Sequence, residues 1–333
     1  MAEEEKASWV FIRKRIEEDV LAVDLQWSLF VAALMSYRHD SVLRPFPPAF
    51  LNGHDEKDIK SLEKVVETVS TLSDLKQCSS FSTQALNLMK WVLDSKSFSL
   101  KTLDKAQFQE VRQKAGDTGD VPIPNYIFEV LPSDLAQEKF EQVRRGRQLL
   151  YGYHGSRCEN FYSILHNGLA SHMNKVSVFG EGTYLSSELS VSLHYSPMGL
   201  GWDQSLIGNK LSCVAVCEMI DDPAVKCQQK LASENRGVKS GKSRANAGNS
   251  EGGEVPEKYY VVQNNDVIRV KYLLVYAHKS PVKRSDKSLQ PAWLQEHRFA
   301  VMMVVYFLIL CVIGMISSDS FQQQVRKYWR QLR

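Results

Sequence analysis

The chain has 333 residues, enough for two domains of ordinary size and a substantial hydrophobic core. Its composition, 44% hydrophobic and 24% charged, is typical of a globular protein and excludes a wholly disordered chain, a collagen-like chain and a multi-span membrane protein. The formal net charge of +3 is too small to indicate a nucleic-acid partner, and we expect none.

The cysteines and the first residues indicate a chain that faces the cytosol. The six cysteines form no CxxC pair, and no histidine cluster lies near them at the spacing of zinc ligands, so we predict reduced thiols and no metal site. The start, Met1-Ala-Glu-Glu-Glu-Lys, is acidic, whereas a secretory signal is basic and then apolar.

The first third of the chain has a helical pattern. Apolar residues at helical spacing, mixed with charged ones, predict an amphipathic helix over residues 9–37. The prolines of Arg44-Pro-Phe-Pro-Pro force an extended path after it. Shorter helices are expected near residues 55–72, 83–94 and 104–115, the last ended by Gly116. We therefore predict an all-α helical domain over residues 1–116, which either regulates the rest of the protein, supports it or binds a partner.

From about residue 121 the apolar pattern changes to a period of two. Strands are predicted at residues 126–131, 149–154, 211–220, 259–262 and 267–276, with short helices near 159–167 and 188–195. This is the pattern of an α+β domain built on an antiparallel sheet, which we place at residues 121–278. Cys213 and Cys217 are expected on one buried face as small hydrophobic residues. The polar stretch 228–256 is expected to be a loop.

The last part of the chain predicts a membrane anchor. Residues 279–298 have the polar composition of a linker, and residues 299–316 then form an uncharged run of 18 residues, about 27 Å as a helix. That length suits the thin bilayer of the endoplasmic reticulum. The 17 residues that follow, 317–333, are predicted to be a short lumenal tail, with insertion after translation and the rest of the chain in the cytosol. The alternative is a buried core helix.

Three short segments carry residues suited to ligand chemistry. They are Tyr153-His154-Gly155-Ser156-Arg157, Phe179-Gly-Glu-Gly-Thr-Tyr184 with the following Ser192 and Tyr195, and Lys258-Tyr259-Tyr260-Val261-Val262. A His-Gly pair at a strand end offers an imidazole beside an unshielded backbone amide and carbonyl, which suits a sugar hydroxyl and a carboxamide. Tyr184 and Tyr195 could clamp a flat heteroaromatic ring, and Ser192, three residues before Tyr195, would lie on the same helical face. Taken singly, each segment also fits ordinary core residues and turns.

Together these motifs resemble a known family. HGSR…NF..IL..GL, followed by FGEGTYLSS and a second tyrosine eleven residues after the first, is similar to the catalytic domain of the diphtheria-toxin-like ADP-ribosyltransferases, the poly(ADP-ribose) polymerase family. The helical part with DSVLRPFP and the single C-terminal apolar run also resemble the tail-anchored mono-ADP-ribosyltransferase branch of the endoplasmic reticulum.

The resemblance implies roles for individual residues, with NAD as the co-substrate and no metal. His154 would bind the adenosine ribose hydroxyl, and the backbone of Gly155 and the hydroxyl of Ser192 would hold the nicotinamide carboxamide. Tyr184 and Tyr195 would be the two rings around nicotinamide. Residues 168–180 would correspond to the loop over the dinucleotide, and residues 228–256 to the loop beside the acceptor.

One position departs from the family pattern. Where polymer-forming members have a glutamate, this chain has Tyr259. A carboxylate there would stabilise the oxocarbenium-like transition state and activate the next sugar hydroxyl, whereas a phenol is uncharged at neutral pH. With His154, Tyr184 and Tyr259 as catalytic residues, we expect transfer of one ADP-ribose rather than elongation. The alternative is a non-catalytic NAD-binding tether.

The resemblance also implies partners and a location. The acceptors would be this protein itself and proteins at the endoplasmic-reticulum or nuclear-envelope membrane, such as stress-sensing kinases and nuclear transport factors. The lipid bilayer would be a further partner, since it would hold the anchor.

Overall fold

The computed structural model describes residues 3–73, 81–169, 179–228, 255–280 and 298–317. Residues Met1–Ser280 form one compact unit and residues Pro281–Arg333 a second. The predicted linker and tail lie almost wholly outside the described residues, as do most of the predicted loops at 168–180 and 228–256.

The first helix, α1 (Glu3–Leu34), is interrupted at Asp19, whose backbone is extended (φ −159°, ψ 87°). The Asp19 carboxylate accepts hydrogen bonds from the backbone N–H of Ala22 at 3.0 Å and from the backbone N–H and hydroxyl of Thr102, both at 2.7 Å. Asp19 therefore caps the second half of α1 and ties it to the strand β1 (Phe98–Leu103).

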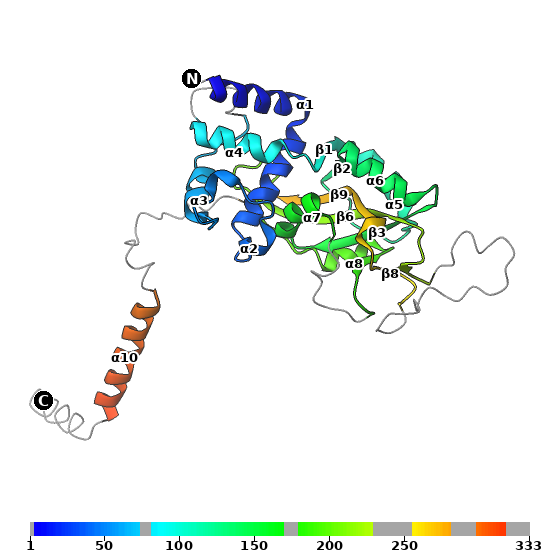
Figure 1. The fold of residues 1–333 in the computed structure, drawn as a ribbon. Helices are drawn as coiled ribbons and strands as arrows, with labels where there is room; N and C mark the ends of the chain where they lie inside the picture. The colour runs from blue at the N-terminus through cyan, green and yellow to red at the C-terminus, as the bar shows by residue number, and fades with distance from the viewer. Residues whose placement is uncertain (1–2, 74–80, 170–178, 229–254, 281–297, 318–333) are drawn as a thin grey trace, which may run out of the picture. The chain divides into compact units, whose positions relative to one another are not determined.

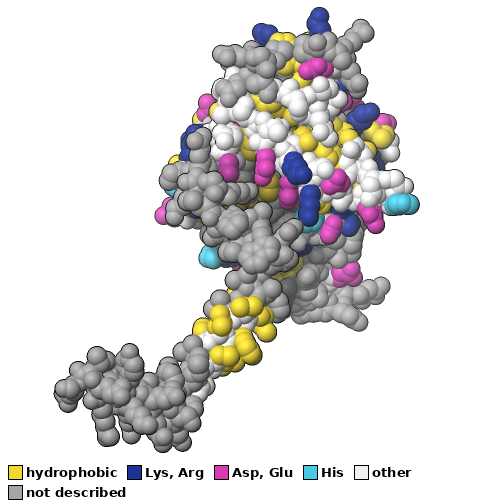
Figure 2. All heavy atoms as spheres, turned by 90° about the vertical axis from the view of Figure 1, so that its left-hand side faces the viewer, with side chains coloured by type: hydrophobic (Ala, Val, Ile, Leu, Met, Phe, Trp, Pro, Cys, Tyr) yellow, Lys and Arg dark blue, Asp and Glu magenta, His cyan; other side chains and the backbone are white. Residues whose placement is uncertain are grey.

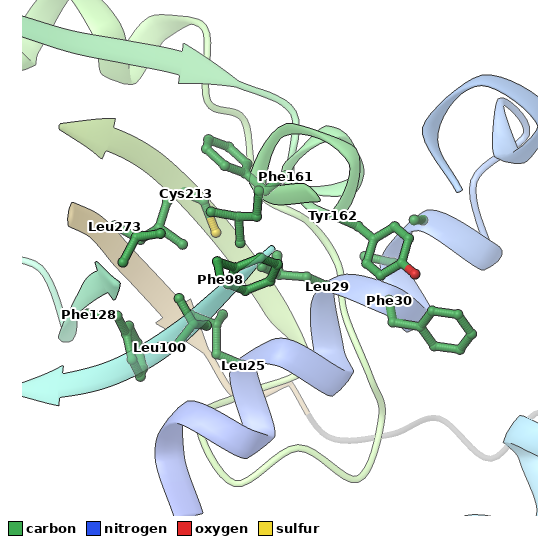
Figure 3. Packing of buried hydrophobic residues seen from close by; sticks show 14 of the residues in the cluster. Leu25, Leu29, Phe30, Phe98, Leu100, Phe128, Phe161, Tyr162, Cys213 and Leu273 are labelled. Carbon is green, nitrogen blue, oxygen red and sulfur yellow. The ribbon is translucent and has the colours of Figure 1, made fainter. Parts of the chain in front are cut away.

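The second half of α1 is not amphipathic, which corrects the expectation for residues 9–37. Residues 22–34 are all buried. The reason is that α1 contacts both α4 and β1, and Figure 3 shows Leu25 and Leu29 of this half beside Phe98 and Leu100 of β1. Asp24, buried on this segment, accepts a hydrogen bond from the Leu206 backbone N–H at 2.8 Å and one from the Ser205 hydroxyl.

The three shorter helices predicted near residues 55–72, 83–94 and 104–115 are present as α3 (Ile59–Glu67), α4 (Thr83–Leu93) and the 3-10 turn η3 (Lys105–Gln107) followed by α5 (Phe108–Ala115). Two further short elements, α2 (His39–Val42) and the 3-10 turn η1 (Pro48–Phe50), were not predicted. Gly116 ends α5 in the left-handed conformation (φ 69°), as expected. The exception is β1, a strand inside the range expected to be helical. Phe98 and Leu100 are buried in β1, while Ser99 and Lys101, which alternate with them, are more exposed; this is the period of two of a strand.

A nine-stranded, wholly antiparallel sheet forms the centre of the first unit (Figure 1). The strand order is β1-β2-β9-β6-β3-β4-β8-β7, and β5 pairs with β6. The five predicted strands and the α+β architecture are confirmed. Besides β1, the strands are β2 (Tyr126–Pro132), β3 (Leu149–Ser156), β4 (Thr183–Ser186), β5 (Gly199–Leu200), β6 (Lys210–Ile220), β7 (Val225–Lys226), β8 (Tyr259–Val262) and β9 (Ile268–His278).

Two hydrophobic cores lie on the two faces of this sheet. On β6, Cys213, Ala215 and Cys217 belong to one core, and Val214 and Val216, which alternate with them, belong to the other. The first core, part of which Figure 3 shows, includes α1, α4 and α7 (Phe161–Asn167). The second includes α5 and α8 (Leu189–His194). The placing of Cys213 and Cys217 on one buried face is confirmed. The remaining elements are α6 (Asp134–Arg144), η4 (Cys158–Asn160) and η7 (Asn265–Val267).

The second unit contains one described helix, α10 (Arg298–Ser317), at the position of the predicted anchor. Its described apolar side chains, among them Met302, Phe307 and Ile309, are exposed (Figure 2). In the described part of the chain, no helix meets the length and apolarity needed to cross a bilayer.

The bonds of Asp19 make a stability prediction. Asp19→Ala removes a helix cap and two charge-assisted hydrogen bonds to β1, so the free energy of unfolding should fall by about 2–3 kcal/mol. Glu17→Ala, which removes an exposed ion pair to Arg13, is the control and should cost less than about 1 kcal/mol. Denaturant unfolding of the purified variants measures the two changes in unfolding free energy. Equal losses for Asp19→Ala and Glu17→Ala would show that the Asp19 bonds stabilise the fold no more than an exposed ion pair does.

Candidate active site at the junction of β3 and β4

The candidate site lies where the sheet is least continuous. β3 pairs with β6 along its whole length, and β4 pairs with β8 along its whole length, but β3 and β4 share a single residue pair, Tyr153 with Ser186. Backbone and side-chain groups at this junction are therefore not all used by the sheet and can face a ligand. All three segments singled out in the sequence contribute a strand here: β3, β4 and β8.

The imidazole of His154 bridges the two strands. Its Nδ1 lies 2.9 Å from the carbonyl oxygen of Tyr184. Burial lowers the pKa of His154, so the ring is neutral at pH 7. A carbonyl can only accept, so Nδ1 carries the proton and donates it, which leaves Nε2 as an acceptor. Nε2 is thus prepared to accept a hydrogen bond from a hydroxyl group, as on a sugar.

Gly155 is fixed by the close approach of α8. A Cβ atom at this position would lie 1.9 Å from the carbonyl oxygen of Ser192, so no side chain fits without moving the helix. The buried Ser192 hydroxyl donates to the Tyr153 carbonyl oxygen at 3.0 Å, and its lone pairs can still accept an amide N–H. Next to it, the Ser196 hydroxyl accepts from the Ser156 backbone N–H at 3.1 Å.

Tyr184 is held by its hydroxyl as well as by its strand. The hydroxyl donates to the Gly180 carbonyl oxygen at 2.6 Å and accepts from the Phe179 backbone N–H at 2.9 Å. The carbonyl of Phe179 in turn accepts from Nζ of Lys226, a side chain with no exposed surface, at 3.0 Å. These bonds fix the ring of Tyr184 and the backbone before it as one unit.

Tyr259 lies on the same face as Tyr184. In the register of β4 and β8, Tyr184 is opposite Val261 and Ser186 is opposite Tyr259, and residues two apart on a strand share a face. The Phe179 ring lies near both, with centroid distances of 6.2 Å to Tyr184 and 6.3 Å to Tyr259. Tyr259 therefore belongs to an aromatic group at the site, together with Phe179 and Tyr184.

Tyr195, unlike the other predicted site residues, has a ring that is exposed at the surface. It follows the last turn of α8, and its side chain is 62% exposed, while Ser192 on the same helix is buried against β3. The structure therefore brings together His154, Gly155, Ser192, Tyr184 and Tyr259, and puts the Tyr195 ring at the surface. A clamp formed by Tyr184 and Tyr195 stays a prediction.

One residue that positions the site, Asp117, had no signal in the sequence. Asp117, far from the motifs, accepts from the first backbone N–H of α8, that of Leu189, at 3.2 Å. Thr183 is 1% exposed, and its hydroxyl has no hydrogen-bond partner among the described residues. Within the same part of the chain, no three His, Cys, Asp or Glu side chains are grouped as metal ligands would be.

The lowered pKa of His154 predicts how stability depends on pH. The unfolded chain binds a proton at this side chain near pH 6.5, whereas the folded chain binds it only at lower pH, so stability should decrease as the pH falls below about 6.5. His154→Gln should weaken this dependence, and replacement of the exposed His54 by Gln should leave it unchanged. Unfolding free energies between pH 5 and pH 8 provide the test, and identical slopes for all three proteins would contradict it.

Comparison with known proteins agrees with this geometry. Residues 14–93 match the family described as ARTD15 N-terminal domain, and residues 105–278 match the poly(ADP-ribose) polymerase catalytic domain. The chain is 45% identical to the protein mono-ADP-ribosyltransferase PARP16 of Mus musculus, over 96% of this chain and 97% of the relative. The identity to PARP16 of Homo sapiens is also 45%, over 95% and 97%.

A more distant relative is the protein mono-ADP-ribosyltransferase PARP8 of Mus musculus, 24% identical over 60% of this chain and 28% of the relative. The full-length similarity and the catalytic-domain match both agree with the motifs gathered at the junction of β3 and β4. The chain therefore belongs to the poly(ADP-ribose) polymerase family and is an enzyme of its mono-ADP-ribosyltransferase branch.

Proposed function

We propose that this protein transfers one ADP-ribose from NAD to protein acceptors, itself included, and releases nicotinamide. The observation that carries the proposal is the meeting of His154, Gly155, Ser192 and Tyr184 at the junction of β3 and β4. The two relatives that are 45% identical to this chain are both named as mono-ADP-ribosyltransferases, which supports the same reaction.

The residues at the junction fit the two ends of NAD. Nε2 of His154 accepts a ribose hydroxyl, because its other nitrogen is committed to the Tyr184 carbonyl. The bare backbone of Gly155 and the Ser192 hydroxyl suit a carboxamide, which both donates and accepts hydrogen bonds. The fixed ring of Tyr184 offers a flat face for nicotinamide.

The reaction needs little covalent help from the protein. The bond between C1′ of the ribose and the nicotinamide nitrogen breaks, and its electron pair neutralises the positive pyridinium ring. The acceptor atom then forms a bond to C1′ and loses a proton to solvent. The side chains described here hold the nicotinamide ribose in one orientation, which lowers the entropic part of the barrier. Tyr259 can position the ribose but brings no negative charge, so a second sugar hydroxyl is not activated and the product is a single ADP-ribose.

The alternative function is an NAD-binding tether without transferase activity. The tyrosine at position 259, where the resemblance implies a glutamate in polymer-forming members, favours it. Against it stand His154, Ser192 and Tyr184, whose side chains would grip the dinucleotide and are held by the bonds described above.

In this proposal the enzyme works at the cytosolic face of the endoplasmic-reticulum membrane. The uncharged run 299–316, whose described apolar side chains in α10 are exposed, supports an anchor there. An anchor would raise the concentration of the catalytic site near acceptors in the same membrane. The acceptors would include membrane-bound stress-sensing kinases and transport factors.

Labelled NAD separates the enzyme from the tether. We expect His154→Ala and Tyr184→Ala to lower incorporation of label at least about tenfold, since each removes groups that orient the donor. His54→Ala, at an exposed position on another part of the molecule, is the control and should be as active as the wild type. Mass analysis of the wild type should show additions of single ADP-ribose units. Equal labelling of all variants, or long polymer chains, would rule out the proposed mechanism.

Membrane extraction tests the anchor. The full chain expressed in cells should stay with membranes through alkaline carbonate washing, because about 18 apolar residues bury enough surface for stable insertion. Leu308→Arg with Ile309→Arg introduces two charges into the run and should release the chain, whereas Leu308→Ile with Ile309→Leu should not. Release of the unaltered chain by carbonate would eliminate the anchor.

A further inference from the structure

The chain leaves the first unit at the end of the sheet where β5, β6 and β9 meet. In the register of these strands, Leu200 is opposite Lys210, and Lys210 is opposite His278. Two hydrogen bonds hold the departing chain there. The Asn209 side-chain amide donates to the Ser280 carbonyl oxygen at 3.1 Å, and the Ser280 backbone N–H donates to Oδ1 of Asn209 at 2.9 Å. The last residue of the first unit is therefore fixed beside this end of the sheet.

This end of the sheet exposes large apolar side chains. Leu200 is 69% exposed, and Met198, just before β5, is 52% exposed. Ile123, 65% exposed, belongs to a segment held at the same end of β9, because the Tyr276 hydroxyl donates to the carbonyl oxygen of Pro122 at 3.0 Å. A group of exposed apolar side chains is typical of a surface that meets a partner or a membrane.

Basic side chains accompany the apolar ones. Lys210, His278 and Lys279 are all exposed, and Asp203 is the one acidic residue between positions 195 and 210. The chain continues from here through residues 279–298, which contain five lysine or arginine residues and two acidic ones. A surface that is both apolar and basic matches the headgroup layer of a membrane with anionic lipids.

A bilayer at the predicted anchor would be within reach of this surface. Eighteen residues separate Ser280 from the uncharged run 299–316, and a chain of that length spans at most about 60 Å when fully extended. An anchored chain would therefore present this end of the sheet to the bilayer at high local concentration, so that a weak contact is enough.

We propose that this surface docks on the headgroup layer of the bilayer that holds the anchor. We call it the exit surface, and it consists of Ile123, Met198, Leu200, Lys210, His278 and Lys279. The apolar side chains enter the interface, and the lysines lie beside anionic headgroups. A second copy of this chain is a poorer occupant, since a symmetric dimer sets two basic surfaces against each other. The inference rests on the proposed function, because the anchor brings the bilayer into reach.

Docking would give the catalytic site a fixed height above the membrane. His154 is opposite Ala215 of β6, and Ala215 is five residues from Lys210 along that strand. Five residues of strand span about 17 Å. The junction of β3 and β4 therefore lies close enough to the exit surface to favour acceptor groups near the lipid headgroups over acceptors that extend far from the membrane.

Vesicle sedimentation tests the inference on a full chain whose anchor is disabled by Leu308→Arg with Ile309→Arg. The vesicles contain phosphatidylcholine and phosphatidylserine. In this parent protein, Leu200→Asp and Met198→Asp should each weaken vesicle binding about tenfold, because an apolar contact is replaced by a charge that anionic lipid repels. Leu135→Asp, at a leucine of α6 that is 78% exposed, is the matched control and should bind like the parent.

Lipid charge separates a membrane from other partners. Lys210→Gln and Lys279→Gln should each weaken binding to the phosphatidylserine vesicles about fivefold, since each loses one attraction to anionic headgroups. Neither change should affect binding to vesicles of phosphatidylcholine alone. Lys60→Gln, which removes an exposed charge from α3, is the control and should bind like the parent to both.

The remaining outcomes are distinct from one another. Denaturant unfolding should show equal stability for the parent and Leu200→Asp, because the leucine is mostly exposed. Equal vesicle binding by the parent and both aspartate variants would overturn the inference. A parent that is dimeric without vesicles, and that Leu200→Asp makes monomeric, would overturn it as well, since the surface would then bind a second copy. The anchor itself is judged by carbonate washing of the unaltered chain, which does not depend on the exit surface.

Discussion

The hydrogen bond from His154 to the Tyr184 carbonyl oxygen is the interaction on which the site depends. It joins β3 and β4, which otherwise share a single residue pair, and it decides which imidazole nitrogen remains free. β3 is paired with β6, and β4 with β8, along their whole lengths. The junction between β3 and β4 can therefore face a ligand while both strands are held in place. The tight contact of α8 with Gly155 then closes the junction from the second face of the sheet.

Much of this architecture could be predicted from local patterns. The strands with alternating or continuous apolar residues, the short helices between them and the glycine at the end of α5 all depend on neighbours in sequence, and they were located to within a few residues. The gathering of His154, Gly155, Ser192 and Tyr184 was predicted from motif chemistry together with family resemblance. Without the resemblance, each segment fitted an ordinary core or turn equally well.

The remaining features depend on contacts between distant residues, which no local pattern contains. The burial of the second half of α1 on all sides follows from α4 and the sheet, and the break at Asp19 follows from Thr102, 83 positions away. Tyr195 was expected to share the direction of Ser192, but its position at the end of α8 leaves its ring exposed.

The strand β1 lies between the N-terminal and the catalytic-domain matches, but it belongs structurally to the catalytic sheet. It ends at Leu103, just before the catalytic-domain match begins at residue 105, yet six of its residues pair with β2. A fragment restricted to the catalytic match would present β2 as an open edge with unpaired amides, ready to add a strand from another molecule. The match to the catalytic domain thus begins at a residue that separates β1 from the strand with which it is hydrogen-bonded. A catalytic fragment that is to stay monomeric therefore has to begin upstream of Phe98.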